Sequence, residues 1–204
     1  MSSSESETTV CNLALARIGA KRINDYTDAT DTKPEAIYCR LMFNQTAKAL
    51  MKDHYWPFGK GRIQLSQNTT TPTFQYTYQY HLPSDFLRLI LFYNGSDRPD
   101  GRTYYTYELE GDQLLTDETA VYLRYVKWVT DVGSWDTLFI ECLVLLLASK
   151  LSMPLTQELE IKQDIDKDLA FLLRKVRAMD RMEEQVIGRD ALRTWQSARY
   201  SDTA

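Results

Sequence analysis

Histidine is the side chain best suited to acid–base chemistry and metal binding at neutral pH. This chain of 204 residues has only two, His54 and His81. Neither stands in a metal-ligand spacing such as His-Glu-x-x-His, so both are interpreted as structural residues. The chain also lacks a Gly-x-Ser-x-Gly nucleophile elbow. Residues 59–62, Gly-Lys-Gly-Arg, lack the spacing and the Ser or Thr of a phosphate-binding loop. The sequence therefore predicts no catalytic residue, no cofactor and no metal site.

Carboxylates are the remaining candidates for chemistry. Residues 164–168, Asp-Ile-Asp-Lys-Asp, alternate like the ligands of a calcium loop. The sharp turn of such a loop needs Gly at the sixth position, where this chain has Leu169. The segment is therefore interpreted as the solvated face of a helix. One enzymatic alternative stays open, a hydrolase acting on cell-envelope polysaccharide, which needs a carboxyl pair about 5–10 Å apart in a cleft.

Composition and charge are those of an ordinary globular protein. The apolar fraction is 44%, the charged fraction is 25% and the net charge is −4. This charge provides no basic surface for wrapping nucleic acid or for binding an anionic membrane. The most apolar run, residues 138–151, contains Glu141 and Lys150. It is shorter than the roughly 20 residues that cross a bilayer. We therefore expect a buried core helix there and no membrane partner.

The three cysteines, Cys11, Cys39 and Cys142, are an odd number and lie far apart, with no Cys-x-x-Cys pair. This usage favours reduced cysteines in the core of a protein in a cytosolic setting. The first residues, Met-Ser-Ser-Ser-Glu-Ser-Glu, lack the basic stretch and the apolar core of a signal peptide.

Two helices are predicted in the first third of the chain. The first covers residues 5–18, because Ser4 and Glu7 have capping-box spacing and Gly19 is a natural residue just past the end of a helix. The second covers residues 34–54 and begins at a proline, which suits a first helical turn. A Tyr-Trp-Pro-Phe sequence follows, and its proline turns the chain away from helical geometry.

The middle of the chain shows the period-two alternation of β-strands. The clearest case is residues 76–82, in which Tyr76, Tyr78 and Tyr80 share one face and are interpreted as core, and Pro83 ends the strand. Further strands are predicted at residues 62–66, 87–93, 103–109, 113–116 and 120–130, with a tight hairpin at Glu-Gly-Asp, residues 110–112. This number of short strands predicts a small sandwich or an open barrel.

The last third returns to helical spacing. Asp136 is expected to cap a third helix that runs through Ser149 and ends before Pro154. Thr156 is expected to cap a fourth helix, whose apolar stripe continues to Met179. The first half of this fourth helix is acidic and the second half is basic, which suits the helix dipole.

The periodicity fades after Gln185, and Gly188 interrupts it. Residues 185–204 cannot bury much surface on their own and are interpreted as a C-terminal tail. Trp, Tyr and Arg are the usual anchors of protein interfaces. The alternative is a terminus that is only loosely docked. The candidate binding residues of this tail are Arg189, Leu192, Arg193, Trp195, Arg199 and Tyr200.

Five short sequence blocks, taken in their order and spacing, point to a known family. They are Cys-Asn-Leu-Ala-Leu-Ala-Arg-Ile-Gly-Ala at 11–20, Asp-His-Tyr-Trp-Pro-Phe at 53–58, Tyr-Gln-Tyr-His-Leu-Pro-Ser-Asp-Phe-Leu-Arg at 78–88, Leu-Leu-Thr-Asp with Val-Tyr-Leu-Arg-Tyr at 114–117 and 121–125, and Asp-Thr-Leu-Phe at 136–139. Through these blocks nearly the whole chain resembles the tail tubular protein A family of tailed phages. Members of that family form the head-to-tail adaptor ring, or gatekeeper, below the portal.

The resemblance implies an α+β fold in which the two ends of the chain form one helical bundle. Residues 1–60 and 131–184 would form this discontinuous bundle domain. Residues 61–130 would form an inserted antiparallel β-domain, and residues 185–204 would form the tail or arm that docks on the portal.

The resemblance also implies a structural virion protein without enzymatic activity. Its expected partners are the portal protein, the tail nozzle or next tail protein, and further copies of itself in a ring matched to the twelvefold portal. DNA would pass through the channel without specific binding. The expected location is the head–tail junction of the virion, after assembly in the host cytoplasm. Whether the isolated chain is a monomer is left open, as is a prophage-encoded bacterial protein with the same role.

Overall fold

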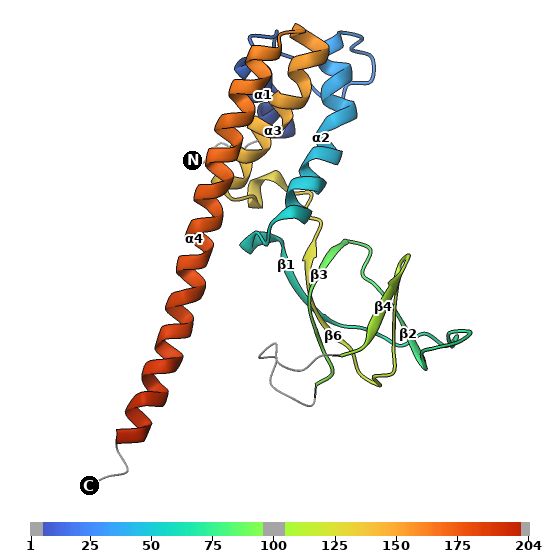
Figure 1. The fold of residues 1–204 in the computed structure, drawn as a ribbon. Coiled ribbons are helices and arrows are strands. Elements are labelled where there is room, and N and C mark those ends of the chain that lie inside the picture. Colours follow the sequence, from blue (N-terminus) through green and yellow to red (C-terminus); the bar gives the residue numbers. More distant parts are fainter. Residues whose placement is uncertain (1–5, 96–104, 201–204) are drawn as a thin grey trace.

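The computed structural model describes residues 6–95 and 105–200, with side chains as far as residue 179 (Figure 1). Within these residues the fold is mixed α+β, with four α-helices and two antiparallel three-stranded sheets, which confirms the α+β class. The helices are α1 (Glu7–Arg17), α2 (Pro34–Asp53), α3 (Thr137–Thr156) and α4 (Leu159–Tyr200). The strands are β1 (Lys60–Gln64), β2 (Tyr78–His81), β3 (Phe86–Tyr93), β4 (Tyr107–Glu110), β5 (Gln113–Thr116) and β6 (Tyr122–Lys127).

Helix α1 begins later than the capping-box spacing predicts. Ser6 is the N-cap, and its side-chain oxygen accepts a hydrogen bond from the backbone N–H of Thr9 at 3.2 Å. Ser6 replaces Ser4 in this role because Ser-x-x-Thr offers the same reach to the third helical N–H. The end of the helix is as predicted: Gly19 adopts a φ of +70°, and the N–H of Ala20 returns to the carbonyl of Leu15.

Helix α3 is the central element of the helical part, since α1, α2 and α4 all pack against it. Its N-cap is Asp136, as predicted, and Phe139, Leu143, Leu147 and Leu151 along its length are completely buried. By length and composition it is the one helix within the described residues that could cross a membrane, and 61% of its most apolar window is buried in this core. The expectation of a buried core helix is confirmed.

The prediction that Pro154 ends α3 is wrong. The helix continues through Pro154 to Thr156 and ends at Gln157, which adopts a left-handed φ of 59°. A proline removes one N–H donor from a helix, but only two helical residues follow Pro154, so little of α3 depends on the lost bond. The Thr156 hydroxyl accepts the N–H of Glu158 at 3.2 Å, so it caps the short link before α4, which begins at Leu159.

The strands form two sheets of order β1-β6-β3 and β2-β5-β4, and every pairing is antiparallel. Strands β4 and β5 are joined by the tight turn predicted at Gly111, whose φ is +59°. The strand around the tyrosines is shorter than predicted and begins at Tyr78. Tyr80 is fully buried, whereas Tyr76 and Tyr78 are only half-buried, so the interpretation of all three as core holds in full for Tyr80 alone.

Two apolar cores follow from this arrangement. The larger one joins the four helices and extends to the sheet β1-β6-β3 through Val126. The smaller one lies among the strands and includes Tyr80, Phe92, Leu114 and Leu123. The helical part and the first sheet are thus connected by continuous packing.

The three cysteines are buried and unbridged, as expected. A hydrogen bond with Cys39 and burial raise the pKa of the Cys11 thiol far above its usual value. Burial raises the pKa of Cys142 to about 11. Because the reactive form of cysteine is the thiolate, both residues are inert packing groups at neutral pH.

Tyr125 makes folding sensitive to alkaline pH. It is 6% exposed, and its hydroxyl donates a hydrogen bond to Asp85 Oδ1 at 3.1 Å. Burial and the neighbouring Asp85 raise the pKa of Tyr125 to about 12, against about 10 in an unfolded chain. A raised pKa in the folded state contributes stability that is complete below pH 10 and is lost as the pH rises towards 12.

We expect Tyr125→Phe to flatten the decline of unfolding free energy between about pH 10 and 12. Denaturant titrations at several pH values measure this slope. Tyr76→Phe, which removes a hydroxyl from a half-buried ring, is the control. The same slope in the wild type and in Tyr125→Phe would contradict the assignment.

Candidate interaction surfaces

The segment interpreted as a tail is helical in the structure. Helix α4 is one continuous helix of 42 residues from Leu159 to Tyr200, and Gly188 does not break it. A helix of this length measures about 60 Å. Figure 1 shows α4 running past the other helices and continuing beyond them to the far end of the molecule.

The six predicted binding residues all lie on the last turns of α4, and their side chains lie outside the described residues. In an α-helix, residues three, four or seven apart occupy the same side. Arg189, Arg193 and Tyr200 have this spacing, and so do Leu192, Trp195 and Arg199. The helical backbone therefore places the six residues in two neighbouring stripes.

The first half of α4 is held by apolar and polar contacts. Ile165, Leu169 and Val176 are buried in the larger core. Asp166 accepts hydrogen bonds from the Ser149 hydroxyl of α3 at 2.5 Å and from Lys162 Nζ at 2.6 Å. These two donors, Lys162 first, lower the pKa of Asp166 below its usual value, so the carboxylate stays charged at neutral pH. The helix is thus fixed to the body by its N-terminal half.

A second attachment ties α4 to the end of α2. Arg177 Nη2 donates to Asp53 Oδ2 at 3.0 Å. At the same end of α2, Arg88 of β3 donates to the carbonyl of Lys52 at 3.1 Å and to the Tyr55 hydroxyl at 2.8 Å. A cation at a helix C-terminus also interacts favourably with the helix dipole. One end of α2 therefore joins α4 and the first sheet.

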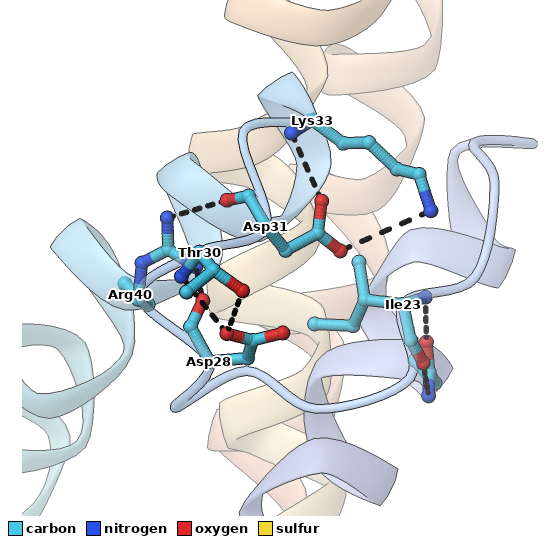
Figure 2. A network of polar contacts seen from close by, with 7 residues as sticks. Ile23, Asp28, Thr30, Asp31, Lys33 and Arg40 are labelled. Atoms are coloured by element: carbon cyan, nitrogen blue, oxygen red, sulfur yellow. Dashed lines mark hydrogen bonds and ion pairs between the residues drawn. The ribbon is translucent and has the colours of Figure 1, made fainter.

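The polar loop between α1 and α2 is fixed to both helices (Figure 2). The Asn12 side chain of α1 donates to the Ile23 carbonyl at 2.9 Å and accepts from its N–H at 2.8 Å. Arg40 of α2 donates to the backbone carbonyls of Asp28 and Asp31. The Asp28 carboxylate in turn accepts from the N–H and the hydroxyl of Thr30. The carboxylates of this loop therefore stabilise turns within the loop itself.

A hollow of about 500 Å³ opens on the outer face of the sheet β1-β6-β3. It is lined by two arginines, two tyrosines and aliphatic groups, with no carboxylate: Arg62, Ile63, Gln64, Leu91, Tyr93, Tyr122, Leu123 and Arg124. Both arginines are exposed. The sequence analysis missed this cluster because its members come from three strands that are distant in the sequence. The available sequence signal for this cluster was the alternation of the basic residue Arg62 with the apolar residue Ile63.

One hollow in the described part of the chain, of about 250 Å³, has the carboxylates of Glu108 and Glu110 in its lining. Both glutamates are exposed on β4. The general acid of a glycoside hydrolase is held instead in an apolar pocket. This hollow therefore gives no support to the hydrolase alternative.

The histidines fit the structural interpretation. The ring of His54 meets the ring of Trp56 edge to face, with 4.9 Å between centroids. His81 is exposed and lies 3.9 Å from Asp112. In the described part of the chain, no three His, Cys, Asp or Glu side chains come together as a metal site.

Comparison with known proteins does not assign a family to this chain. The described residues offer extended surfaces: a helix of 42 residues, and sheet edges with exposed charged side chains. No protein-family model matches the chain, and no curated protein matches it either.

Proposed function

We propose that this protein is a structural, non-enzymatic virion protein, the head-to-tail adaptor that forms a ring below the portal of a tailed phage. It would join the portal to the tail and extend the channel through which DNA leaves the head. The observation that carries the proposal is α4, a single helix fixed at one end whose other end carries the interface-type residues. This agrees with the sequence blocks that resemble the tail tubular protein A family.

The proposed architecture assigns separate roles to the parts of the chain. Helices α1, α2, α3 and the first half of α4 would form a bundle, and the β-strands would form a domain inserted into it. The bundle and the inserted domain would form a rigid wedge of the ring. The C-terminal end of α4 would reach the portal, and the nozzle or next tail protein would bind on the other side of the ring.

Assembly as a ring explains how such a contact becomes strong. When one copy is bound, neighbouring contacts become effectively intramolecular, so that many weak dockings add to a tight association. A single copy should therefore bind the portal poorly. The net charge of −4 suits a channel for DNA, because a basic lining would hold phosphates.

Deleting residues 185–204 tests the proposal. We expect the shortened protein to remain folded, because it keeps Ile165, Leu169 and Val176, the described buried residues of α4. It should no longer sediment with purified portal rings. Trp195→Ala with Tyr200→Ala should weaken the association by about tenfold or more, as loss of interface anchors does.

The matched control lies on the same helix. Phe171→Ala removes an aromatic side chain that is 71% exposed on the anchored half of α4, and it should leave sedimentation with portal rings unchanged. If the deleted protein sediments with portals as the wild type does, the portal-binding role of the α4 end is wrong.

A further inference from the structure

The two sheets each present an edge strand to solvent. Strand β1 is the edge of the sheet β1-β6-β3, and β4 is the edge of the sheet β2-β5-β4. Four of the five residues of β1 and all four residues of β4 are exposed. An edge strand has unpaired backbone N–H and C=O groups, which can pair with another chain.

The side chains of these two strands are complementary. In β1, the basic residues Lys60 and Arg62 alternate with Gly61 and Ile63. In β4, the acidic residues Glu108 and Glu110 alternate with Tyr107 and Leu109. Because side chains alternate between the two faces of a strand, each strand has one charged face and one apolar or small face. The charges of the two strands are opposite.

None of these four charged side chains has a polar partner within the described part of the chain. No side-chain hydrogen bond or ion pair there involves Lys60, Arg62, Glu108 or Glu110. Arg62 also lies opposite Arg124 of β6, so two cations are neighbours on one face without a carboxylate in the hollow they line. Like charges directly opposite on a sheet are destabilising, and an acidic strand beside them would relieve this repulsion.

We propose that β4 of one copy pairs antiparallel with β1 of the next copy, with Arg62 opposite Glu108 and Lys60 opposite Glu110. The same register places Ile63 opposite Tyr107 and Leu109 opposite Gly61. The Tyr125 ring covers Gly61, at 3.0 Å from where a Cβ atom would lie, so Leu109 would meet an aromatic surface. A shift by one residue would set charges against apolar groups on both faces.

There is space beside the C-terminal end of β1. A hollow of about 480 Å³ lies there, lined by residues 63–69 and 81–83. It leaves room next to Ile63 and Gln64. The alternation of the two strands, their opposite charges and this space favour a second copy over any other occupant.

The pairing would be head to tail. The two edges differ, so each copy can offer β1 to one neighbour and β4 to another, and such a repeated contact forms a ring when its rotation closes. The inference deepens the proposed function by naming the contact between neighbouring copies. The pairing itself is tested without any portal.

Charge reversal provides the first test, read by sedimentation of the purified protein over a wide concentration range. We expect the wild type to self-associate. Lys60→Glu with Arg62→Glu, and separately Glu108→Lys with Glu110→Lys, should each weaken association at least tenfold. A mixture of the two variants should restore association, because the acidic β1 of one variant faces the basic β4 of the other, and all four changes in one chain should restore it as well. Equal association of the wild type and both variants would overturn the pairing.

Cross-linking provides the second test and fixes the register. The same register places Gln64 opposite Thr106, and both side chains are exposed. A chain carrying Gln64→Cys and a chain carrying Thr106→Cys should form a disulfide on mild oxidation, since opposite residues of a sheet meet the geometry of the bond. Gln64→Cys with Asp112→Cys, out of register, is the control. The native cysteines are buried and do not interfere.

The outcomes separate this inference from the proposed function. A monomeric wild type together with no cross-link between the Gln64→Cys and Thr106→Cys chains, or equal cross-linking with Thr106→Cys and Asp112→Cys, would overturn the edge pairing. If that protein still sediments with portal rings through the α4 end, the adaptor role stands without it. If the cross-link forms and portal rings are not bound, the edge pairing stands and the adaptor role falls.

Discussion

Replacing Phe139 with Ala is expected to lower the free energy of unfolding by about 3–5 kcal/mol. Phe139 is completely buried in α3. The centroid of its ring lies 5.1 Å from that of Trp56, 5.1 Å from that of Phe58 and 5.0 Å from that of Trp135, and all three contacts are edge to face. Truncation would remove all three ring contacts and leave a cavity that these large neighbours cannot fill. Denaturant unfolding followed by circular dichroism measures the change.

The control for this substitution is Phe171→Ala on α4. The chemical change is identical, but Phe171 is 71% exposed, so the free energy of unfolding should change by no more than about 0.5 kcal/mol. If the two variants lose similar stability, Phe139 is not the centre of the core.

Replacing Val176 with Asp is expected to detach α4 from the body and to cost about 3 kcal/mol or more. Val176 is 4% exposed in the larger core. A carboxylate placed there would lose its hydration, with no described partner to replace it. Hydrogen exchange should therefore rise along the first half of α4, and the melting temperature should fall.

Lys175→Asp is the matched control, because it introduces the same carboxylate one residue earlier at an exposed position. It should leave hydrogen exchange in α4 and the melting temperature nearly unchanged. If the amides of α4 remain protected from hydrogen exchange in Val176→Asp, the polar contacts of Asp166 and Arg177 are sufficient to hold the helix.

The sequence alone predicted most helix ends and turns, because the residues that determine them lie close to them in the chain. The start of α2 at a proline, the cap at Asp136, the turn at Gly111 and the end of α1 at Gly19 all depend on residues within one turn of the boundary. Such short-range signals do not depend on the rest of the fold.

The errors arose where the structure departs from a local signal. Pro154 lies in the last turn of α3, and that turn stays helical with Leu155 half-buried against the larger core. Gly188 lies within α4 although glycine in a helix interior costs about 1 kcal/mol. Tyr76 alternates like a strand residue, but the chain turns at Gln75, whose φ is 73°, and pairing starts only at Tyr78.

The candidate surfaces were predictable only in part. The residues at the end of α4 stand together in the sequence, so their composition could be recognised directly. The pairing of Arg62 with Arg124 depends on the register between β1 and β6, which no periodicity within one strand reveals. The complementarity of β1 and β4 requires knowledge that both are edges.

The order of elements along the chain has a consequence for synthesis on the ribosome. Helices α1 and α2 have little contact with each other and pack mainly on α3, which is encoded after all six strands. The apolar faces of the first two helices therefore remain exposed while the strands are translated. A nascent chain with such surfaces is prone to aggregate, so chaperone occupancy should be highest before α3 emerges from the exit tunnel.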